Sequence, residues 1–145
     1  MTGRTRTLTS NSDTLPLAGC KILVVEDEFF FADDLCRALT AAGAAILGPI
    51  NDAKDALRLV QDQPDLQGAI LDINVRGTVI YGVADELTRR GVPFVFATGY
   101  DRATVPTLYG HVPRWEKPFD PAALVQSLPA IMRCDRRASA DQGTG

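Results

Sequence analysis

In the segment Gly68-Ala-Ile-Leu-Asp72-Ile-Asn74, a short apolar run ends on one aspartate. The next residues, Val75-Arg76-Gly77, predict a loop. An apolar run between turn residues is typical of a strand that is covered on both faces, as in a parallel sheet. Because ligands bind at the carboxyl ends of such strands, Asp72 is a candidate for chemistry. The alternative is that Asp72 only caps the following turn.

Strands and helices alternate on both sides of this stretch. Apolar runs predict strands at 21–25, 45–49, 68–72, 93–98 and 112–115, and helical spacing or capping predicts helices at 29–39, 53–60, 81–90, 101–110 and from 121 onward. The pattern predicts an α/β fold, a flavodoxin-like doubly wound sheet of five parallel strands in the order 2-1-3-4-5. Pro106 removes a backbone donor in the fourth helix, so we expect that helix to be degenerate: short, distorted or mobile.

The two ends of the chain differ in composition from its centre. Residues 1–19 are rich in Thr, Ser, Gly and Arg, and residues 133–145 are polar, so we expect flexible extensions around one domain at 20–132, with no second core. This domain holds ten of the 15 basic residues and fifteen of the 18 acidic ones, a net charge of -5. An acidic domain argues against direct binding of nucleic acid.

The sequence also bears on membrane association and on the cysteines. No apolar run approaches the roughly 18 residues that a membrane span needs, and no apolar segment follows Arg4 and Arg6 to make a signal peptide. We therefore expect a cytoplasmic protein that does not bind membranes.

Cys20, Cys36 and Cys134 lie far apart and form no Cys-x-x-Cys pair, so we expect all three to be reduced and to hold no zinc.

Polar side chains follow four of the predicted strands. These are Glu26 and Asp27, Asp72, Thr98, and Lys117. In a parallel sheet these strand ends meet at one edge. Two carboxylates about 4 Å apart repel each other by roughly 4 kcal/mol at an effective dielectric constant near 20, so such a cluster calls for a cation. Oxygen ligands suit Mg²⁺, and a carboxylate beside Mg²⁺, a lysine and a hydroxyl is equipped to accept a phosphoryl group.

Each of these residues also has a purely structural interpretation. Glu26 or Asp27 could cap the next helix and oppose its dipole. Thr98 could be an ordinary β-branched strand residue, and Lys117 could be a solvated surface lysine. Because all of these residues lie at the ends of four predicted strands, a shared site is favoured.

Four segments together resemble the receiver domain of two-component response regulators over about 21–132. They are Val24-Val-Glu-Asp-Glu28, Leu71-Asp-Ile-Asn74, Ala97-Thr98 and Lys117-Pro-Phe119. The resemblance implies that Asp72 is the phosphoacceptor and that Asp27 is a direct ligand of Mg²⁺ or Mn²⁺. It implies further that Glu26 binds the metal through water and that the main-chain carbonyl of Asn74 completes the metal site.

The resemblance extends to the groups that hold phosphate. It implies that Thr98 and Lys117 contact the phosphoryl group and that the Lys117–Pro118 bond is cis. Pro93-Phe-Val-Phe-Ala-Thr-Gly-Tyr100 also resembles the signature of a stand-alone subset nicknamed "FAT GUY", found chiefly in alphaproteobacteria.

The chain departs from the usual receiver pattern at the switch residue. Arg114 stands three residues before Lys117, where the family usually has a tyrosine or phenylalanine. Tyr100 and Trp115 are candidates to replace that aromatic residue, and Arg114 itself occupies the switch position.

The resemblance implies a single-domain response regulator that accepts phosphate from a histidine kinase or a phosphotransfer protein. It would signal by protein contact or act as a phosphate sink, and it would assist only its own phosphorylation and dephosphorylation. One alternative is a flavodoxin-like nucleotide-binding enzyme, but the chain has no glycine-rich phosphate loop after a strand. A magnesium-dependent phosphatase of the haloacid-dehalogenase type would need a second aspartate where Asn74 stands, and His111 lies in a predicted loop and is not expected to be a catalytic base.

Overall fold

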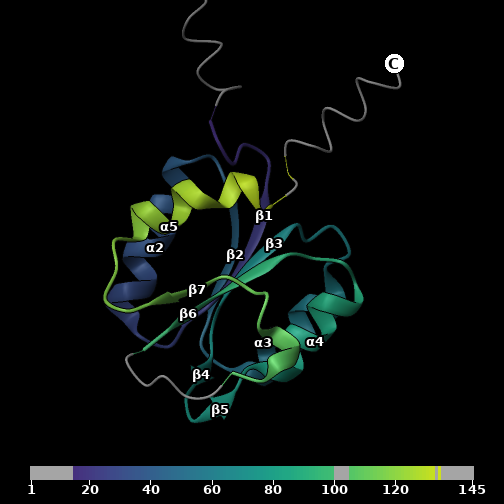
Figure 1. Cartoon of the computed structure of the whole chain (residues 1–145). Helices are drawn as coiled ribbons and strands as arrows, with labels where there is room; N and C mark the ends of the chain where they lie inside the picture. Colours follow the sequence, from purple (N-terminus) through teal and green to yellow (C-terminus); the bar gives the residue numbers. More distant parts are fainter. Residues whose placement is uncertain (1–14, 100–104, 133, 135–145) are drawn as a thin grey trace, which may run out of the picture.

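A computed structural model describes residues 15–99, 105–132 and 134. The larger elements alternate between strand and helix (Figure 1). In chain order they are β1 (Lys21–Val25), α2 (Phe29–Ala41), β2 (Ala45–Ile50), α3 (Ala53–Asp62), β3 (Gly68–Asp72), β4 (Asn74–Val75), β5 (Thr78–Val79), α4 (Tyr81–Arg89), β6 (Phe94–Thr98), η1 (Thr107–Tyr109), β7 (Arg114–Glu116), α5 (Pro121–Ser127) and η2 (Leu128–Ala130).

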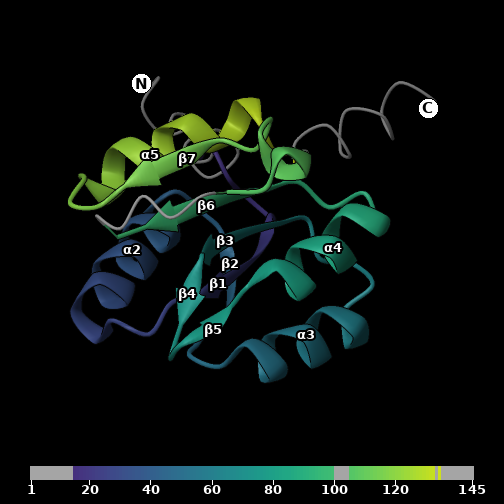
Figure 2. The same ribbon diagram turned by 60° about the horizontal axis from the view of Figure 1, so that its bottom comes forward.

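The central sheet has five strands in the order β2-β1-β3-β6-β7, and all neighbouring pairs are parallel. This confirms the predicted flavodoxin-like order 2-1-3-4-5. Helices α2 and α5 cover one face of the sheet, and α3 and α4 cover the other (Figures 1 and 2). Every residue of β3 and of β6 is buried, as expected for strands covered on both faces.

The core is divided by the sheet into two layers because side chains alternate along each strand. In β1, Ile22 and Val24 pack toward α2 and α5, whereas Leu23 and Val25 pack toward α3 and α4. Leu17 also lies in the layer with α2 and α5 and is fully buried, so the packed part of the chain includes residues before Cys20.

Two helices begin where the sequence predicts. Asp52 is the N-cap of α3, and its side chain accepts hydrogen bonds from the main-chain N–H groups of Lys54 and Asp55. Asp120 caps α5 by accepting one hydrogen bond from Ala122 N, with Pro121 in the first turn. None of the described helices is long and apolar enough to cross a membrane.

The predicted loop after Asp72 contains a small hairpin, visible at the end of the sheet in Figure 2. In it β4 and β5 are antiparallel, with Asn74 opposite Val79 and Val75 opposite Thr78. The expected fourth helix is reduced, within the described residues, to the 3₁₀ turn η1, which begins directly after Pro106. The expected residues 101–104 of that helix lie outside the described part of the chain.

The expectation that all three cysteines are reduced is wrong for two of them. Cys20 and Cys134 form a disulfide, with Cα atoms 4.8 Å apart, and Cys36 is free. The two partners are separated by 114 residues in the sequence, so their spacing gave no sign of the pairing. The fold joins them by packing Cys134 against the layer that also holds Cys20.

Candidate functional site

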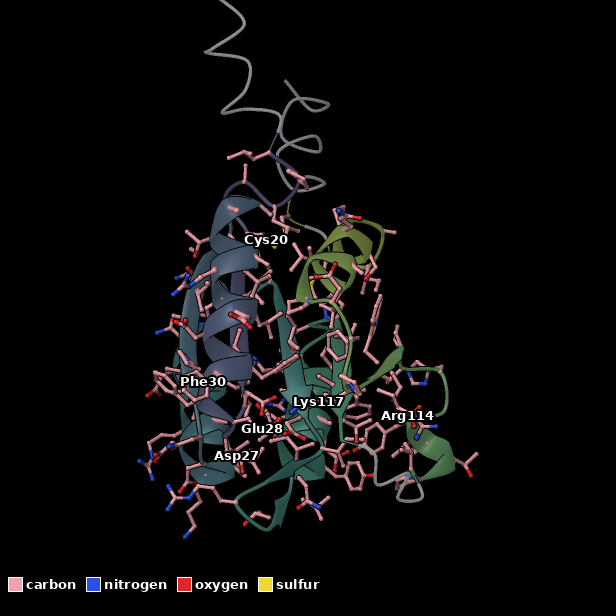
Figure 3. All side chains as sticks on the ribbon, turned by 90° about the vertical axis from the view of Figure 1, so that its left-hand side faces the viewer. Cys20, Asp27, Glu28, Phe30, Arg114 and Lys117 are labelled. Atoms are coloured by element: carbon pink, nitrogen blue, oxygen red, sulfur yellow. A yellow bond between two sulfur atoms is a disulfide. The ribbon has the colours of Figure 1, made fainter. Side chains whose placement is uncertain are left out.

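The predicted site residues meet at the carboxyl edge of the sheet. Glu26 and Asp27 follow β1, Asp72 ends β3, Thr98 ends β6 and Lys117 follows β7. Figure 3 shows Asp27, Glu28 and Lys117 close together at this end, with Cys20 at the opposite end of the fold. An open pocket of about 600 Å³ is lined by Asp27, Glu28, Phe31, Asp72, Ile73, Asn74, Thr98, Gly99, Lys117 and Pro118.

Three carboxylates form the acidic part of the site. Glu26, Asp27 and Asp72 each place an oxygen within 4.8 Å of the others. Glu26 and Asp72 are buried, whereas Asp27 is exposed. Burial, with the charge of Asp72 adding to it, raises the pKa of Glu26 to about 7 although its bonds to Lys117 oppose the shift. Burial also raises the pKa of Asp72, against the opposing charge of Lys117.

Lys117 is the positive charge of the site. Its Nζ lies 2.8 Å from Glu26 Oε1, 2.7 Å from Glu28 Oε1 and 3.3 Å from Asp72 Oδ2. Its side chain is only 12% exposed, and the ammonium group lies 4.6 Å from the centre of the Phe31 ring. Burial alone would lower the pKa of Lys117, but the hydrogen bonds to Glu26 and Glu28, together with the charges of Asp72 and Glu26, outweigh burial and raise that pKa. Lys117 is therefore not a solvated surface lysine.

Main-chain N–H groups hold the carboxylates in place. Arg76 N donates to Asp27 Oδ2 at 2.8 Å, and Asn74 N donates to Asp72 Oδ1 at 3.2 Å. Glu28 N donates to Glu26 Oε2 at 2.9 Å. The N-cap residue of α2 is Glu28, which makes no side-chain cap bond, so neither Glu26 nor Asp27 caps this helix.

Thr98 and the peptide bond after Lys117 complete the pocket. Thr98 is 7% exposed at the end of β6, where it lines the pocket. Its main-chain carbonyl accepts a hydrogen bond of 2.8 Å from Lys117 N, which joins the ends of β6 and β7. The Lys117–Pro118 peptide bond is cis.

The candidate switch residues occupy different surroundings. Arg114 is exposed, and Figure 3 places it to the side of the acidic group. Trp115 is half-buried against Phe119, with ring centres 5.4 Å apart, and Tyr100 lies outside the described residues.

Sequence reasoning missed a buried aromatic residue on the other side of β6. Tyr109 is 4% exposed, stacks on Tyr81 at 5.2 Å and packs edge-on against Phe96. Its hydroxyl donates to the Asp85 carboxylate. The sequence predicted a helix over 101–110, whereas Tyr109 lies in the 3₁₀ turn η1, from which its ring stacks on Tyr81 at the start of α4.

Sequence reasoning also missed two groups at the acidic site. Glu28 was the third acid of the run after β1 and could have been included on that ground. The Arg76 N–H group carries no residue-specific signal, since every residue other than proline has one.

The donor set fits a divalent cation. Three clustered carboxylate oxygens are the ligands that Mg²⁺ and Mn²⁺ prefer, and one lysine only partly offsets their charge. Beside them, Asp72 presents a carboxylate in an open pocket that also holds an ammonium group and a hydroxyl group. Such an arrangement can stabilise added negative charge next to a carboxylate nucleophile.

No protein-family model and no curated protein matches this chain. Among solved structures, the chain is similar to the solution structure of SdrG from Sphingomonas melonis Fr1, with 35% sequence identity, a TM-score of 0.68 and coverage of 77% of this chain and 94% of SdrG. The BeF3-activated conformation of SdrG from Pseudomonas melonis Fr1 matches with 35% identity, a TM-score of 0.64 and coverage of 78% and 96%. The signal receiver domain of a putative Luxo repressor protein from Vibrio parahaemolyticus shares the fold, with 18% identity, a TM-score of 0.69 and coverage of 87% and 98%.

Proposed function

We propose that this chain, which belongs to the receiver-domain family of response regulators, is a signalling protein that accepts a phosphoryl group on Asp72. The observation that carries the proposal is the position of the Asp72 carboxylate. This carboxylate lies at the end of a central strand and lines the pocket. Its Oδ2 is 3.3 Å from Lys117 Nζ, and two further carboxylates lie beside it. No other acidic residue among those described combines these features.

In the proposed reaction, Asp72 is the nucleophile. A carboxylate oxygen attacks phosphorus, and the bond from phosphorus to the donor's imidazole nitrogen breaks as that nitrogen takes the electron pair. Lys117 and the Thr98 hydroxyl bind the phosphoryl oxygens. Lys117 is already held within reach of Asp72, so it needs only to turn from Glu28 and Glu26 toward the new charge.

The acidic residues hold the cofactor in this proposal. When bound, Mg²⁺ or Mn²⁺ supplies positive charge that offsets the charge of the phosphoryl oxygens. Asp27 and Asp72 would bind it directly, Glu26 would bind through water and Asn74 would contribute its main-chain carbonyl. This assignment is supported by the 4.8 Å cluster of carboxylate oxygens and by the exposure of Asp27 toward the pocket.

We further propose that the phosphodonor is a histidine kinase or a histidine phosphotransfer protein. Phe29 and Phe30, 73% and 80% exposed, follow the acidic run and offer apolar surface to a protein partner beside the pocket. The output is a protein contact or the removal of phosphate from a pathway. Membership of the "FAT GUY" subset stays a prediction.

Phosphotransfer tests the proposal. The purified chain is incubated with ³²P-labelled phosphorylated histidine kinases of its source organism, and with acetyl phosphate, in the presence and absence of Mg²⁺. We expect label on wild-type protein only with the cation, and none on Asp72→Asn. Asp33→Asn, which changes a half-exposed aspartate that pairs with Arg37 on α2, outside the pocket, is the matched control and should be labelled normally. Label that persists in Asp72→Asn, or that is unaffected by chelator, would show that the site is assigned wrongly.

A further inference from the structure

The β4–β5 hairpin has a two-residue turn with an arginine at its first position. Its two turn residues, Arg76 and Gly77, have φ angles of 50° and 80°. A two-residue hairpin loop of this type needs positive φ at both positions. Arg76 is the only residue other than glycine, within the described part of the chain, that adopts a positive φ. A side chain is strained in this conformation, and such strain is typically kept where the position of the backbone matters.

The hairpin touches the acidic site at both ends of β4. At its base, Asn74 N donates to the Asp72 carboxylate, and at its tip, Arg76 N donates to Asp27 Oδ2 at 2.8 Å. The second bond joins residues 49 positions apart in the sequence. Asp27 is the exposed member of the acidic cluster, and no other hydrogen bond to its side chain is found among the described residues.

We propose that the β4–β5 hairpin is a positioning element for the cation site, in which the Arg76 main-chain N–H holds the Asp27 carboxylate in the orientation that binds the cation. The inference rests on the proposed function, because it assigns Asp27 to the cation. An exposed aspartate otherwise samples several rotamers, and a fixed hydrogen bond to one oxygen leaves the other directed to the metal. Such outer-shell hydrogen bonds typically change metal affinity by about 10–100-fold when they are lost.

The coupling acts in both directions. If the bond from Arg76 N raises the affinity of Asp27 for the cation, the bound cation strengthens that bond by the same factor. The hairpin is then held more firmly when the cation site is filled. The amide hydrogen of Arg76 reports this directly, since it exchanges with solvent only when the hydrogen bond opens.

A substitution at Gly77 tests the role of the hairpin without changing any of the proposed metal ligands. No atom lies within 4 Å of a Cβ built on Gly77, so a side chain there meets no neighbour and acts only through the turn conformation. Gly77→Val disfavours the positive φ and displaces Arg76 N, whereas Gly77→Asn is the conservative control because asparagine tolerates this conformation. Isothermal titration with Mg²⁺ should give a Kd about tenfold higher for Gly77→Val and nearly unchanged for Gly77→Asn.

The second measurement is amide hydrogen exchange in the wild-type protein, in which the turn is unchanged. The exchange rate of the Arg76 amide, measured by NMR, should fall several-fold when Mg²⁺ is added. In Asp27→Asn the side-chain oxygen still accepts the hydrogen bond, so the amide should remain protected but should no longer respond to Mg²⁺.

The outcomes distinguish this inference from the proposed function. If wild-type protein does not bind Mg²⁺, the proposed cofactor is wrong. If wild-type protein binds Mg²⁺ but Arg76 exchange does not change, or if folded Gly77→Val binds as tightly as wild type, the hairpin does not position Asp27 and the inference is overturned.

Discussion

Replacing Lys117 by methionine tests the charge balance of the site. Methionine keeps an apolar, unbranched side chain and removes the ammonium group, which lies 4.6 Å from the centre of the Phe31 ring. The substitution leaves Glu26 and Asp72, whose side chains are 2% and 9% exposed, without their positive partner. We expect the metal-free protein to be strongly destabilised near neutral pH.

The size of the effect follows from burial. Removing one partner of a buried ion pair costs about 3–5 kcal/mol, because the remaining charge is left unpaired. Glu28 adds little, since its side chain is 62% exposed and such pairs are worth at most about 1 kcal/mol. For a chain of this size the lower figure corresponds to a fall in Tm on the order of 10 °C. The cost should shrink at lower pH, because Glu26, whose pKa is raised to about 7, is then neutral.

Thermal denaturation at about pH 8 and about pH 5.5, with and without Mg²⁺, measures the effect. Lys54→Met, which changes an exposed lysine on α3, is the control and should melt like wild type. Mg²⁺ should stabilise Lys117→Met at least as strongly as wild type, because the carboxylates that hold the cation remain. If Lys117→Met has the Tm of wild type at both pH values, Lys117 does not neutralise buried carboxylates, and our account of the site is wrong.

Two further substitutions give measurable results. The raised pKa of Glu26 means that the folded protein holds this proton more tightly than the unfolded chain, so metal-free wild type should lose stability as pH rises from 4.5 to about 7. Urea denaturation gives the free energy of unfolding at each pH. In Glu26→Gln this free energy should change less between these pH values, and a wild-type free energy that does not change with pH would contradict the prediction. Tyr109→Phe should cost about 1 kcal/mol, because it removes the hydroxyl that donates to Asp85. A double-mutant cycle with Asp85→Ala checks this, and a coupling energy near zero would exclude the pair as a stabilising contact.

The strands could be predicted from the sequence because their burial leaves a local signal. Gly68–Asp72 and Phe94–Thr98 are buried on both faces, so their sequences are continuous apolar runs. In a parallel sheet the carboxyl ends of the strands meet at one edge. The positions of these strands in the sequence therefore predict that Asp72, Thr98 and Lys117 lie at the same edge.

Features that depend on contacts between distant segments could not be predicted. The hairpin after Asp72 depends on a strained φ at Arg76, a residue that rarely adopts this conformation. Its contact with Asp27 uses a main-chain N–H that has no sequence signature. The disulfide between Cys20 and Cys134 depends on where the chain runs after η2, which no local pattern specifies.

Lys117 connects the stability of the protein with its proposed chemistry. In the metal-free protein its single charge is shared among Glu26, Glu28 and Asp72, and two of these carboxylates are buried. A phosphoryl group on Asp72 would draw the ammonium group away from Glu26 and Glu28. That movement leaves the buried Glu26 unpaired, which is costly unless another positive charge is already present or Glu26 takes up a proton. At a pH above about 7, where Glu26 has lost its proton, this charge balance predicts that the cation is bound before the phosphoryl group is transferred, and that a chelator prevents phosphotransfer.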